Sequence, residues 1–483
     1  IFPDRFCEGV ENKPMPFSDR LYQADKHAEP FWQPNEVGGH LNEDYFGGDL
    51  KGIQQKLPYL HEMGVDFIYL NPIFEAHSNH RYNTADYLNV DPLLGTNEDF
   101  EALCTAAKKY GIGIVLDGVF SHTGSDSRYF NREGRYGEGG AYRDPNSPYR
   151  CWYDFGPQYK GGYRSWWGFE TLPEVNEETP SYVEFITGPG GVIDTWLRRG
   201  AAGFRLDVAD ELPDEFIEKV RAAVKRVSPE KFLLGEVWED ATTKFGFNKR
   251  RTYLLGKGLD SVMNYPFKNA VLDFVKGKPA EQAMTEILTI CEHYPAPAMD
   301  TALNFLSTHD TERALTVIAD EPANGRGRAW QSGRCVTGDA YEEGLLRLRM
   351  AYAIIYTLPG VPCLYYGDEI AMQGYRDPFN RAFFRWDAHE QRLRPVLAQL
   401  AQLRHTCEAF RTGQLRVLRA EDGILHYQRV GKVETAEIIV NRTEHIIVEP
   451  LASGKHTEVN PMGFTIVVEE VGHNPNHSYY DYK

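Results

Sequence analysis

The chain has 483 residues, with 52 Lys and Arg against 69 Asp and Glu, so its formal net charge at pH 7 is −17. Phosphate backbones and anionic lipid repel such a protein, which argues against nucleic acid and membrane surfaces as partners. Apolar residues make up 42% and charged residues 25%, as in ordinary globular proteins, and no apolar run approaches the roughly 18 residues of a membrane span.

The seven cysteines are odd in number and far apart, and none forms a CxxC pair. This spacing argues against a disulfide scaffold, a zinc ribbon and a redox motif. Reduced cysteines favour a reducing compartment, so we predict a cytoplasmic protein.

Short apolar runs alternate with amphipathic stretches over about the first 400 residues, as in repeated βα units around a parallel sheet. The candidate strands are IFPDRF from Ile1, DFIYLN from Asp66, GIVLDGV from Gly113, AGFRLDV from Ala202, FLLGEVW from Phe232, SVMNY from Ser261, ALNFLS from Ala302 and PCLYYG from Pro362. Helix-like stretches between them cover residues 50–64, 97–111, 213–227 and 342–358. These eight alternations predict an α/β fold, a (β/α)₈ TIM barrel.

Two regions depart from this alternation. Residues 121–180 are rich in Gly, Tyr, Arg, Asp and Trp without helical periodicity, and are too long for an ordinary loop, so we predict an excursion domain over the barrel mouth after the third strand. Residues 412–483 contain short alternating strands typical of a C-terminal antiparallel β-sandwich. The catalytic barrel would then comprise residues 1–120 and 181–411.

Carboxylates follow several of the predicted strands. Asp117 ends the third strand, Asp207 the fourth and Glu236 the fifth, and Asp310 follows the seventh. A single Asp after a strand is usually a helix cap or turn residue. Four acids at the carboxyl ends of barrel strands, where reactive side chains stand in this fold, instead indicate acid–base chemistry.

The spacing of two of these acids points to a reaction type. Neighbouring strands lie about 4.8 Å apart, so Asp207 and Glu236 can bring their carboxyls to the roughly 5 to 5.5 Å that retaining glycosidases use. Arg205 lies on the same strand face as Asp207 and would keep it ionised, as a nucleophile must be. Glu236 has no cation beside it in sequence and follows an apolar run, so we expect a raised pKa and the role of general acid.

Four strings carry a family resemblance. DGVFSH (117–122), GFRLDVADE (203–211), GEVWED (235–240) and FLSTHD (305–310) resemble, in order and spacing, the signature regions of the α-amylase superfamily, glycoside hydrolase family 13. HRYNTADY (80–87), YFGGDL (45–50) and GYRDPFNR (374–381) are most similar to the neopullulanase, cyclomaltodextrinase and maltogenic amylase branch.

The resemblance implies roles for individual residues. Asp207 would be the nucleophile, Glu236 the acid/base and Asp310 the stabiliser of the transition state, with Asp117 in support. The residues implied to bind or orient the substrate around them are Tyr82, which would stack on the sugar, His122 and His309, which would donate to its hydroxyls, and Arg205, which would orient the nucleophile. A structural histidine or a core tyrosine is the alternative at these positions. Tyr163, Trp166 and Trp167 are either further sugar platforms or a small aromatic core.

The implied function is a retaining α-glucan hydrolase that cleaves α-1,4 bonds, with α-1,6 bonds left open, in maltooligosaccharides, cyclodextrins, pullulan or starch. A transglycosylase is the first alternative, because the same covalent intermediate can pass to a sugar hydroxyl. A catalytically inactive binding protein is the second. The expected partner is the α-glucan, and a homodimer stays open.

Metal ligands of the family are partly missing. Many relatives carry Asn, often a calcium ligand, at the place of Ser121. Relatives also place Asn and Asp residues after the RF pair at 5–6, where this chain has CEGVENKP. Gly47 and Asp49 remain, yet too few oxygen ligands accompany them for the roughly 6 to 8 that calcium takes. We predict no required cofactor or metal, with a structural calcium as the alternative.

Overall fold

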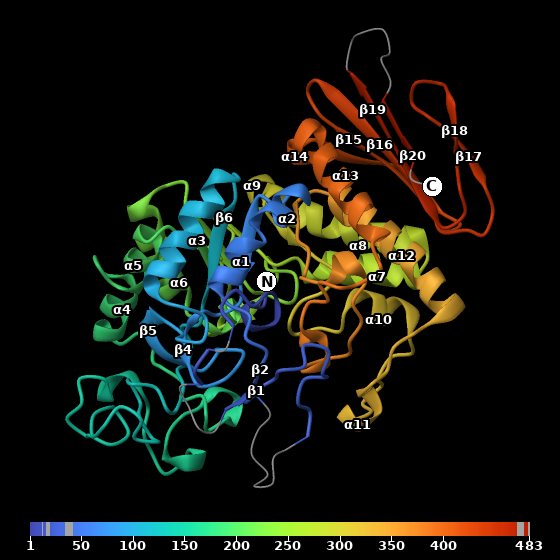
Figure 1. Ribbon diagram of the computed structural model, residues 1–483. Helices are drawn as coiled ribbons and strands as arrows, with labels where there is room; N and C mark the ends of the chain where they lie inside the picture. The colour runs from blue at the N-terminus through green and yellow to red at the C-terminus, as the bar shows by residue number, and fades with distance from the viewer. Residues whose placement is uncertain (12, 16–19, 34–41, 471–477, 482–483) are drawn as a thin grey trace.

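Five parallel strands form the centre of the α/β part of the chain (Figure 1). The computed structural model describes residues 1–11, 13–15, 20–33, 42–470 and 478–481. The sheet has the order β11-β8-β7-β6-β3, and its strands are β3 (Phe67–Leu70), β6 (Gly113–Gly118), β7 (Gly203–Leu206), β8 (Phe232–Gly235) and β11 (Ser261–Val262).

Backbone hydrogen bonds extend this sheet at both edges. A parallel bridge from Met263 to Leu303 leads to the pair β12 (Leu303–Asn304) and β13 (Val361–Pro362). At the other edge the Ile1 amine donates to the Tyr69 carbonyl at 2.8 Å and the Asn71 amide donates to the Ile1 carbonyl at 3.0 Å. Seven of the eight predicted strands therefore lie in one parallel order.

The first predicted strand, IFPDRF, is wrong beyond Ile1. Pro3 lacks the N–H that a strand ladder needs, and residues Pro3–Arg5 form the 3₁₀ turn η1. Among the described residues no ladder joins β13 to the N-terminal segment, so hydrogen bonds trace an open arc and not a closed barrel.

Helices follow the strands, as predicted. The stretch 50–64 forms two helices, α1 (Leu50–Gln55) and α2 (Leu57–Glu62), because Pro58 cannot donate to the preceding turn. A capping box of Thr96 and Asp99 begins α3 (Asn97–Lys109). The remaining helices are α4 (Pro180–Thr187), α5 (Val192–Arg198), α6 (Asp214–Val227), α7 (Tyr265–Lys276), α8 (Ala280–His293), α9 (Ala296–Asp300), α10 (Ala314–Ala319), α11 (Arg328–Gln331), α12 (Gly338–Thr357), α13 (Leu393–Thr406) and α14 (Ala409–Thr412).

The helices bury apolar faces against the sheet. Phe100, Leu103, Cys104 and Ala107 of α3 share one helical face and are buried in the main core. Burying a large apolar side chain stabilises the fold by about 1.5 to 3 kcal/mol. Short strand pairs lie outside the central sheet: β1 (Leu21–Tyr22) with β2 (Asp44–Tyr45), β4 (Phe74–Ala76) with β5 (Thr84–Val90), and β9 (Phe245–Gly246) with β10 (Lys249–Arg250).

Between β6 and α4 the chain forms turns and the short 3₁₀ helices η2 (Arg150–Trp152), η3 (Lys160–Gly162) and η4 (Trp166–Gly168). Its core is aromatic: the Phe130 ring lies 4.6 Å from the Tyr163 ring and 4.8 Å from the Tyr153 ring. Tyr163 is fully buried there, so of its two predicted roles the structural one holds. The predicted limits of this excursion, 121–180, stay a prediction.

The C-terminal part is antiparallel. Five strands lie in the order β14-β15-β16-β19-β20 and are β14 (Gln414–Glu421), β15 (Ile424–Val430), β16 (Glu434–Asn441), β19 (Gly463–Glu470) and β20 (Ser478–Asp481). A hairpin of β17 (Ile447–Pro450) and β18 (His456–Val459) packs on one face through a small cluster that includes Ile439 and Val459. Residues 471–477 and 482–483 of the predicted domain lie outside the described residues.

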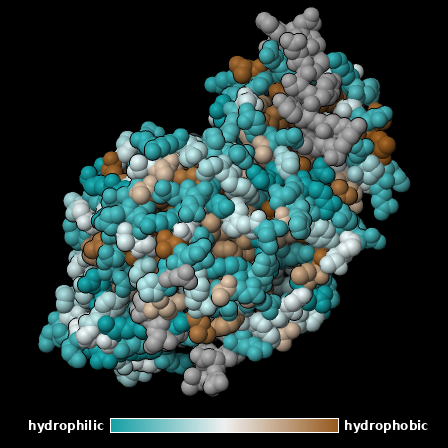
Figure 2. Space-filling view, in the orientation of Figure 1, coloured by the Kyte–Doolittle hydropathy of each residue, from teal (hydrophilic) through white to brown (hydrophobic). Residues whose placement is uncertain are grey.

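Hydrophilic residues dominate the visible face, and apolar ones are scattered over it (Figure 2). No helix in the described part of the chain is long and apolar enough to cross a membrane.

Candidate active site

Three predicted site carboxylates meet around one arginine. Asp117 lies near the end of β6, and Asp207 and Glu236 directly follow β7 and β8. Arg205 of β7 is fully buried, and its Nη1 lies 2.7 Å from Asp117 Oδ1 and 2.8 Å from Asp207 Oδ1. Its Nη2 lies 2.8 Å from Glu236 Oε2. One guanidinium therefore holds three buried carboxylates at the carboxyl ends of adjacent strands.

The expected environment of Glu236 is wrong. We predicted that no cation accompanies it, yet Arg205 Nη2 contacts it, and Val208 N and Trp238 Nε1 donate to it at 2.9 and 3.0 Å. The physical reason is the strand register. Arg205 pairs with Leu234 across β7 and β8, and Glu236, two residues further, lies on the same face.

Burial dominates the electrostatics of this cluster. It raises the pKa of Asp207 well above its ordinary value and raises that of Glu236, while Arg205 opposes both shifts. With all three carboxylates ionised, one guanidinium would leave two buried negative charges uncompensated. Burial together with this repulsion therefore favours the protonated forms of Asp207 and Glu236, and Arg205 favours their ionised forms.

Backbone strain aligns one of the contacts to Glu236. Val208 adopts a left-handed conformation, with φ 41° and ψ 48°. A β-branched residue rarely adopts this conformation, which costs about 1 to 3 kcal/mol. The turn points the Val208 amide at Glu236 Oε2, directly after the predicted nucleophile.

Tyr82 lies in the loop between β4 and β5, and hydrogen bonds to its hydroxyl hold it in place. Its hydroxyl donates to Asp117 Oδ2 at 2.7 Å, and the Tyr69 hydroxyl donates to the same oxygen at 2.6 Å. Asn71 Nδ2 donates to the Tyr82 hydroxyl at 3.1 Å. Asp117 thus connects Arg205 with Tyr82, and the Tyr82 ring is only partly buried, as a sugar platform requires.

Asp310 lies across the site beside His309 and Arg381. His309 Nε2 is 3.0 Å from its Oδ2 and Arg381 Nη2 is 3.5 Å from its Oδ1. Although burial opposes ionisation, these neighbours hold the pKa of Asp310 below its ordinary value. The His309 ring stacks on Tyr82 with centroids 5.2 Å apart and an angle of 10° between planes, so His309 joins Asp310 to the predicted platform.

His122 has both ring nitrogens engaged by the protein. Nδ1 lies 2.9 Å from Ser121 Oγ and Nε2 lies 3.0 Å from the Tyr82 carbonyl. Burial lowers its pKa to about 4, so the ring is neutral at physiological pH. In this arrangement His122 positions the backbone of Tyr82, and Ser121 is committed to His122.

Three residues of the site were missed as individual side chains: Tyr69, Asn71 and Arg381. Arg381 Nε also donates to the His309 carbonyl at 3.0 Å. A signal for it existed, because Arg381 ends the string GYRDPFNR. Tyr69 lies near the end of β3 and Asn71 directly follows it, so the same strand-end argument that found the acids applies to these hydrogen-bonding residues.

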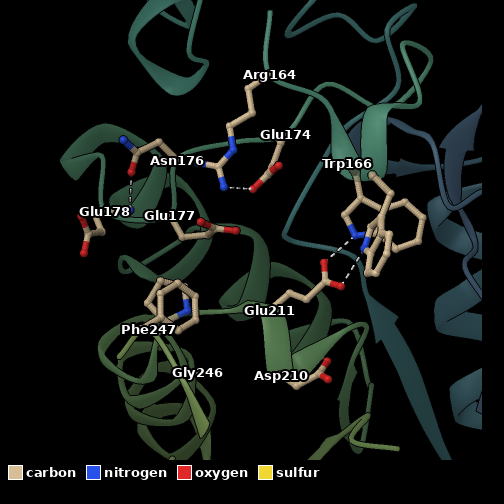
Figure 3. Close-up of a pocket in the computed structure, with 12 residues that line it drawn as sticks. Arg164, Trp166, Glu174, Asn176, Glu177, Glu178, Asp210, Glu211, Gly246 and Phe247 are labelled. Carbon is tan, nitrogen blue, oxygen red and sulfur yellow. Dashed lines mark hydrogen bonds and ion pairs between the residues drawn. The ribbon is translucent and has the colours of Figure 1, made fainter. Parts of the chain in front are cut away.

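Beside this site lies a cleft of about 600 Å³ between the 121–179 segment and the segments after β7 and β8 (Figure 3). Carboxylates and aromatic rings line most of it. Its residues are Arg164, Trp166, Trp167, Glu174, Asn176, Glu177, Glu178, Asp210, Glu211, Pro213, Gly246 and Phe247. The Trp166 ring lies 5.4 Å from that of His122, so the cleft adjoins the site at this ring pair.

One carboxylate holds two indoles in this cleft. Glu211, four residues after Asp207, accepts from Trp166 Nε1 at 2.6 Å and from Trp167 Nε1 at 2.9 Å. Trp167 is nevertheless 76% exposed, and Phe247, 53% exposed, belongs to the loop between β9 and β10 on the other side of the cleft. Both rings offer flat apolar faces, which suit sugars.

Comparison with known proteins identifies the family. The family described as alpha amylase, catalytic domain, matches residues 1–413. An amylopullulanase of Thermoanaerobacter thermohydrosulfuricus is 35% identical over 89% of this chain, and a cyclomaltodextrinase of Geobacillus thermopakistaniensis is 32% identical over 93% of it. The chain spans 31% of the amylopullulanase and 69% of the cyclomaltodextrinase.

A solved structure agrees over the whole length. The ligand-free cyclic α-maltosyl-(1→6)-maltose hydrolase of Arthrobacter globiformis superposes with a TM-score of 0.81 at 27% identity, covering 98% of this chain and 97% of that one. The chain belongs to the α-amylase family, which confirms the family predicted from the sequence. A cyclomaltodextrinase among the relatives agrees with the predicted branch.

Proposed function

We propose that this chain is a retaining α-glucan hydrolase in which Asp207 is the nucleophile, Glu236 the acid/base and Asp310 the transition-state stabiliser. The observation that carries the proposal is the Arg205 cluster, which brings Asp207 and Glu236 together at adjacent strand ends. The family and its glycosidase relatives support the same reading. We further propose that the strands of this open arc belong to a (β/α)₈ barrel that is closed by packing of the N-terminal segment and not by a complete strand ladder.

In the first step an Asp207 oxygen attacks the anomeric carbon of the glucosyl unit. Arg205 contacts Oδ1, which leaves Oδ2 for the attack. The bond from this carbon to the glycosidic oxygen breaks, and the proton on the Glu236 carboxyl passes to that oxygen. A β-linked glucosyl ester of Asp207 forms and the leaving sugar departs.

In the second step Glu236, now ionised, takes a proton from water. The water oxygen bonds to the anomeric carbon, the ester bond to Asp207 breaks, and the product has the α configuration of the substrate. The contacts of Glu236 suit this base form, because Val208 N and Trp238 Nε1 are both donors.

The remaining groups hold the sugar. Tyr82 stacks its ring on the glucosyl unit at the cleaved bond. Ionised Asp310 accepts hydrogen bonds from the hydroxyls of this sugar and stabilises the positive charge that develops on the sugar ring. His309 contacts both Asp310 and Tyr82 and holds them in place, while Arg205 orients Asp207. For His122 we propose a positioning role through the Tyr82 carbonyl.

The substrates we propose are α-1,4-linked maltooligosaccharides, cyclodextrins, pullulan or starch, with α-1,6 bonds as a second target. The leaving sugars would lie in the cleft between Trp167 and Phe247. We infer a reducing, cytoplasmic setting from the seven free cysteines. A homodimer remains a proposal as well.

The reaction type is tested by following the anomers of the product. Maltotriose is digested in an NMR tube, and the α-anomer of the newly formed reducing end should appear first and then mutarotate. Initial release of the β-anomer would show an inverting enzyme and overturn the assignment of Asp207 as nucleophile.

The cleft favours transglycosylation as a second activity. Two exposed rings beside the nucleophile can hold an acceptor sugar in place of water. Products longer than maltotriose, formed at high substrate concentration, would support it. Release of glucose and maltose alone at every concentration would restrict the enzyme to hydrolysis, and no turnover of maltotriose, γ-cyclodextrin, pullulan or starch would favour a binding protein.

A further inference from the structure

A lysine ammonium lies inside a group of oxygens on the turn between β2 and α1. Lys13 Nζ lies 2.6 Å from Asp49 Oδ2 and donates to the carbonyls of Gly47 at 2.7 Å and Leu93 at 3.1 Å. The Lys13 side chain is only 11% exposed. An ammonium has three donors, and three oxygens receive them here.

The same turn receives a second ammonium from the same N-terminal segment. Lys26 Nζ donates to the Phe46 carbonyl at 2.5 Å and to the Tyr22 hydroxyl at 2.9 Å, and lies 3.0 Å from Glu8 Oε2. Two successive carbonyls, those of Phe46 and Gly47, are thus held by two lysines.

Calcium does not fit this group of oxygens. Calcium takes about 6 to 8 oxygens at roughly 2.3 to 2.6 Å, whereas three oxygens of described residues lie around Lys13 Nζ at hydrogen-bonding distances. The Asp49 carboxylate is also committed to amides, since it accepts from Gly9 N at 3.1 Å, Val10 N at 3.0 Å and Gly52 N at 2.6 Å. The described part of the chain contains no group of three or more His, Cys, Asp or Glu residues arranged to hold a metal.

We propose that Lys13 is the built-in cation of this turn and makes the attachment of the N-terminal segment independent of divalent metal. The ammonium neutralises Asp49 and ties Lys13 to the turn 46–49 and to Leu93, while Asp49 accepts from Gly9 N and Val10 N. Lys26 adds a second tie of the same kind.

The turn also supports the loop that carries Tyr82. Asn79 Nδ2 donates to the backbone carbonyl of Asp44 at 3.0 Å and to its Oδ1 at 2.9 Å. Arg81 Nη1 donates to the Asn79 carbonyl at 2.8 Å. Strand β2, which leads into this turn, is therefore hydrogen-bonded to the loop that carries the predicted sugar platform.

The test compares Lys13→Met with Lys51→Met, which removes an ammonium that is 55% exposed and lies 3.7 Å from Asp99. Melting temperatures are measured in EDTA and in millimolar calcium, together with hydrogen exchange of the amides at 9–10 and 46–49. We expect the same melting temperature for the wild type in both buffers. Lys13→Met should melt about 3 to 6 °C lower, with faster exchange in both segments, and Lys51→Met should behave as the wild type.

Either of two results overturns the proposal. One is a wild type that calcium stabilises, and the other is a Lys13→Met variant that matches Lys51→Met in melting and exchange. If Lys13→Met does not fold, Lys13→Gln, which keeps a donor without the charge, should show a smaller loss in the same direction. None of these measurements depends on the proposed enzymatic activity.

Discussion

The floor of the site and the cleft beside it consist of different kinds of side chain. The floor is buried and dense in charge, with Arg205 joining Asp117, Asp207 and Glu236. The cleft is more open and combines aromatic rings with carboxylates, and Glu211 holds Trp166 and Trp167 there. The floor comes from strand ends, where the sheet register fixes positions, whereas the cleft comes from connecting segments. We therefore assign bond cleavage to the floor and the choice of leaving or acceptor sugar to the cleft.

The largest effect is expected at the floor from Asp207→Asn. Without the nucleophile the ester cannot form, so kcat/KM on maltotriose should fall by at least about 10⁴-fold. Because the substitution removes a negative charge from an over-acidic cluster, the melting temperature should not decrease. A loss of less than tenfold would remove Asp207 from the mechanism.

Arg205→Lys tests whether one cation organises the floor. A lysine ammonium is a compact point charge and cannot reproduce the planar fork that places Arg205 Nη1 and Nη2 against the three carboxylates, so kcat/KM should fall by about 10²- to 10³-fold. Weaker neutralisation raises the pKa of Asp207, so the acidic limb of the pH profile should move to higher pH by about one unit. An unchanged limb with reduced activity would show that Arg205 only supports the fold.

Glu211→Ala tests the cleft separately from the floor. Without Glu211 the indoles of Trp166 and Trp167 lose the acceptor that holds them in place, so the leaving sugars should bind more weakly. We expect kcat/KM on maltohexaose to fall about tenfold. An activated aryl maltoside, whose leaving group makes few cleft contacts, should change little. Glu178→Ala is the matched control, because Glu178 lines the same cleft and is exposed. Equal losses on both substrates would contradict the division between floor and cleft.

Glu177→Gln should give the smallest effect. Burial, followed by Glu174, raises the pKa of Glu177 to about 8, so its carboxyl is protonated at neutral pH and ionises above pH 8. The added negative charge in an acidic cleft should weaken substrate binding in the wild type there. Glu177→Gln should remove this loss and exceed the wild type about two- to fivefold in kcat/KM at pH 9. If the pH profiles of kcat/KM for Glu177→Gln and the wild type have the same alkaline limb, Glu177 is not part of the binding surface.

The sequence predicted the parallel strands well where a run of apolar residues ends in a functional residue. Seven of the eight predicted strands are found, and their order in the sheet follows their order in the chain. The first run failed because Pro3 interrupts it. The antiparallel pair β4–β5 was missed, since its short strands lie outside the βα alternation and depend on tertiary contacts such as Arg81 with Asp91.

The site could be predicted residue by residue but not its electrostatics. The argument for an isolated Glu236 considered neighbours in sequence, whereas Arg205 reaches it across the parallel register. Lys13 was missed for a related reason. Its partners, Gly47, Asp49 and Leu93, are 34 to 80 residues away, and no local pattern marks a lysine that folds back onto carbonyls.

The left-handed Val208 has a consequence for saturation mutagenesis of the site. Glycine adopts its backbone angles without a steric cost, and Asn or Asp adopts them more readily than a β-branched residue. In a selection for growth on maltodextrin, the Val208→Gly variant should therefore survive. Val208→Ile and Val208→Thr, which are also β-branched, should grow like the parent. Val208→Pro should be lost, because proline has no N–H to donate to Glu236. Such a tolerance map would separate the backbone demand at this position from the chemical demands on Asp207 and Glu236.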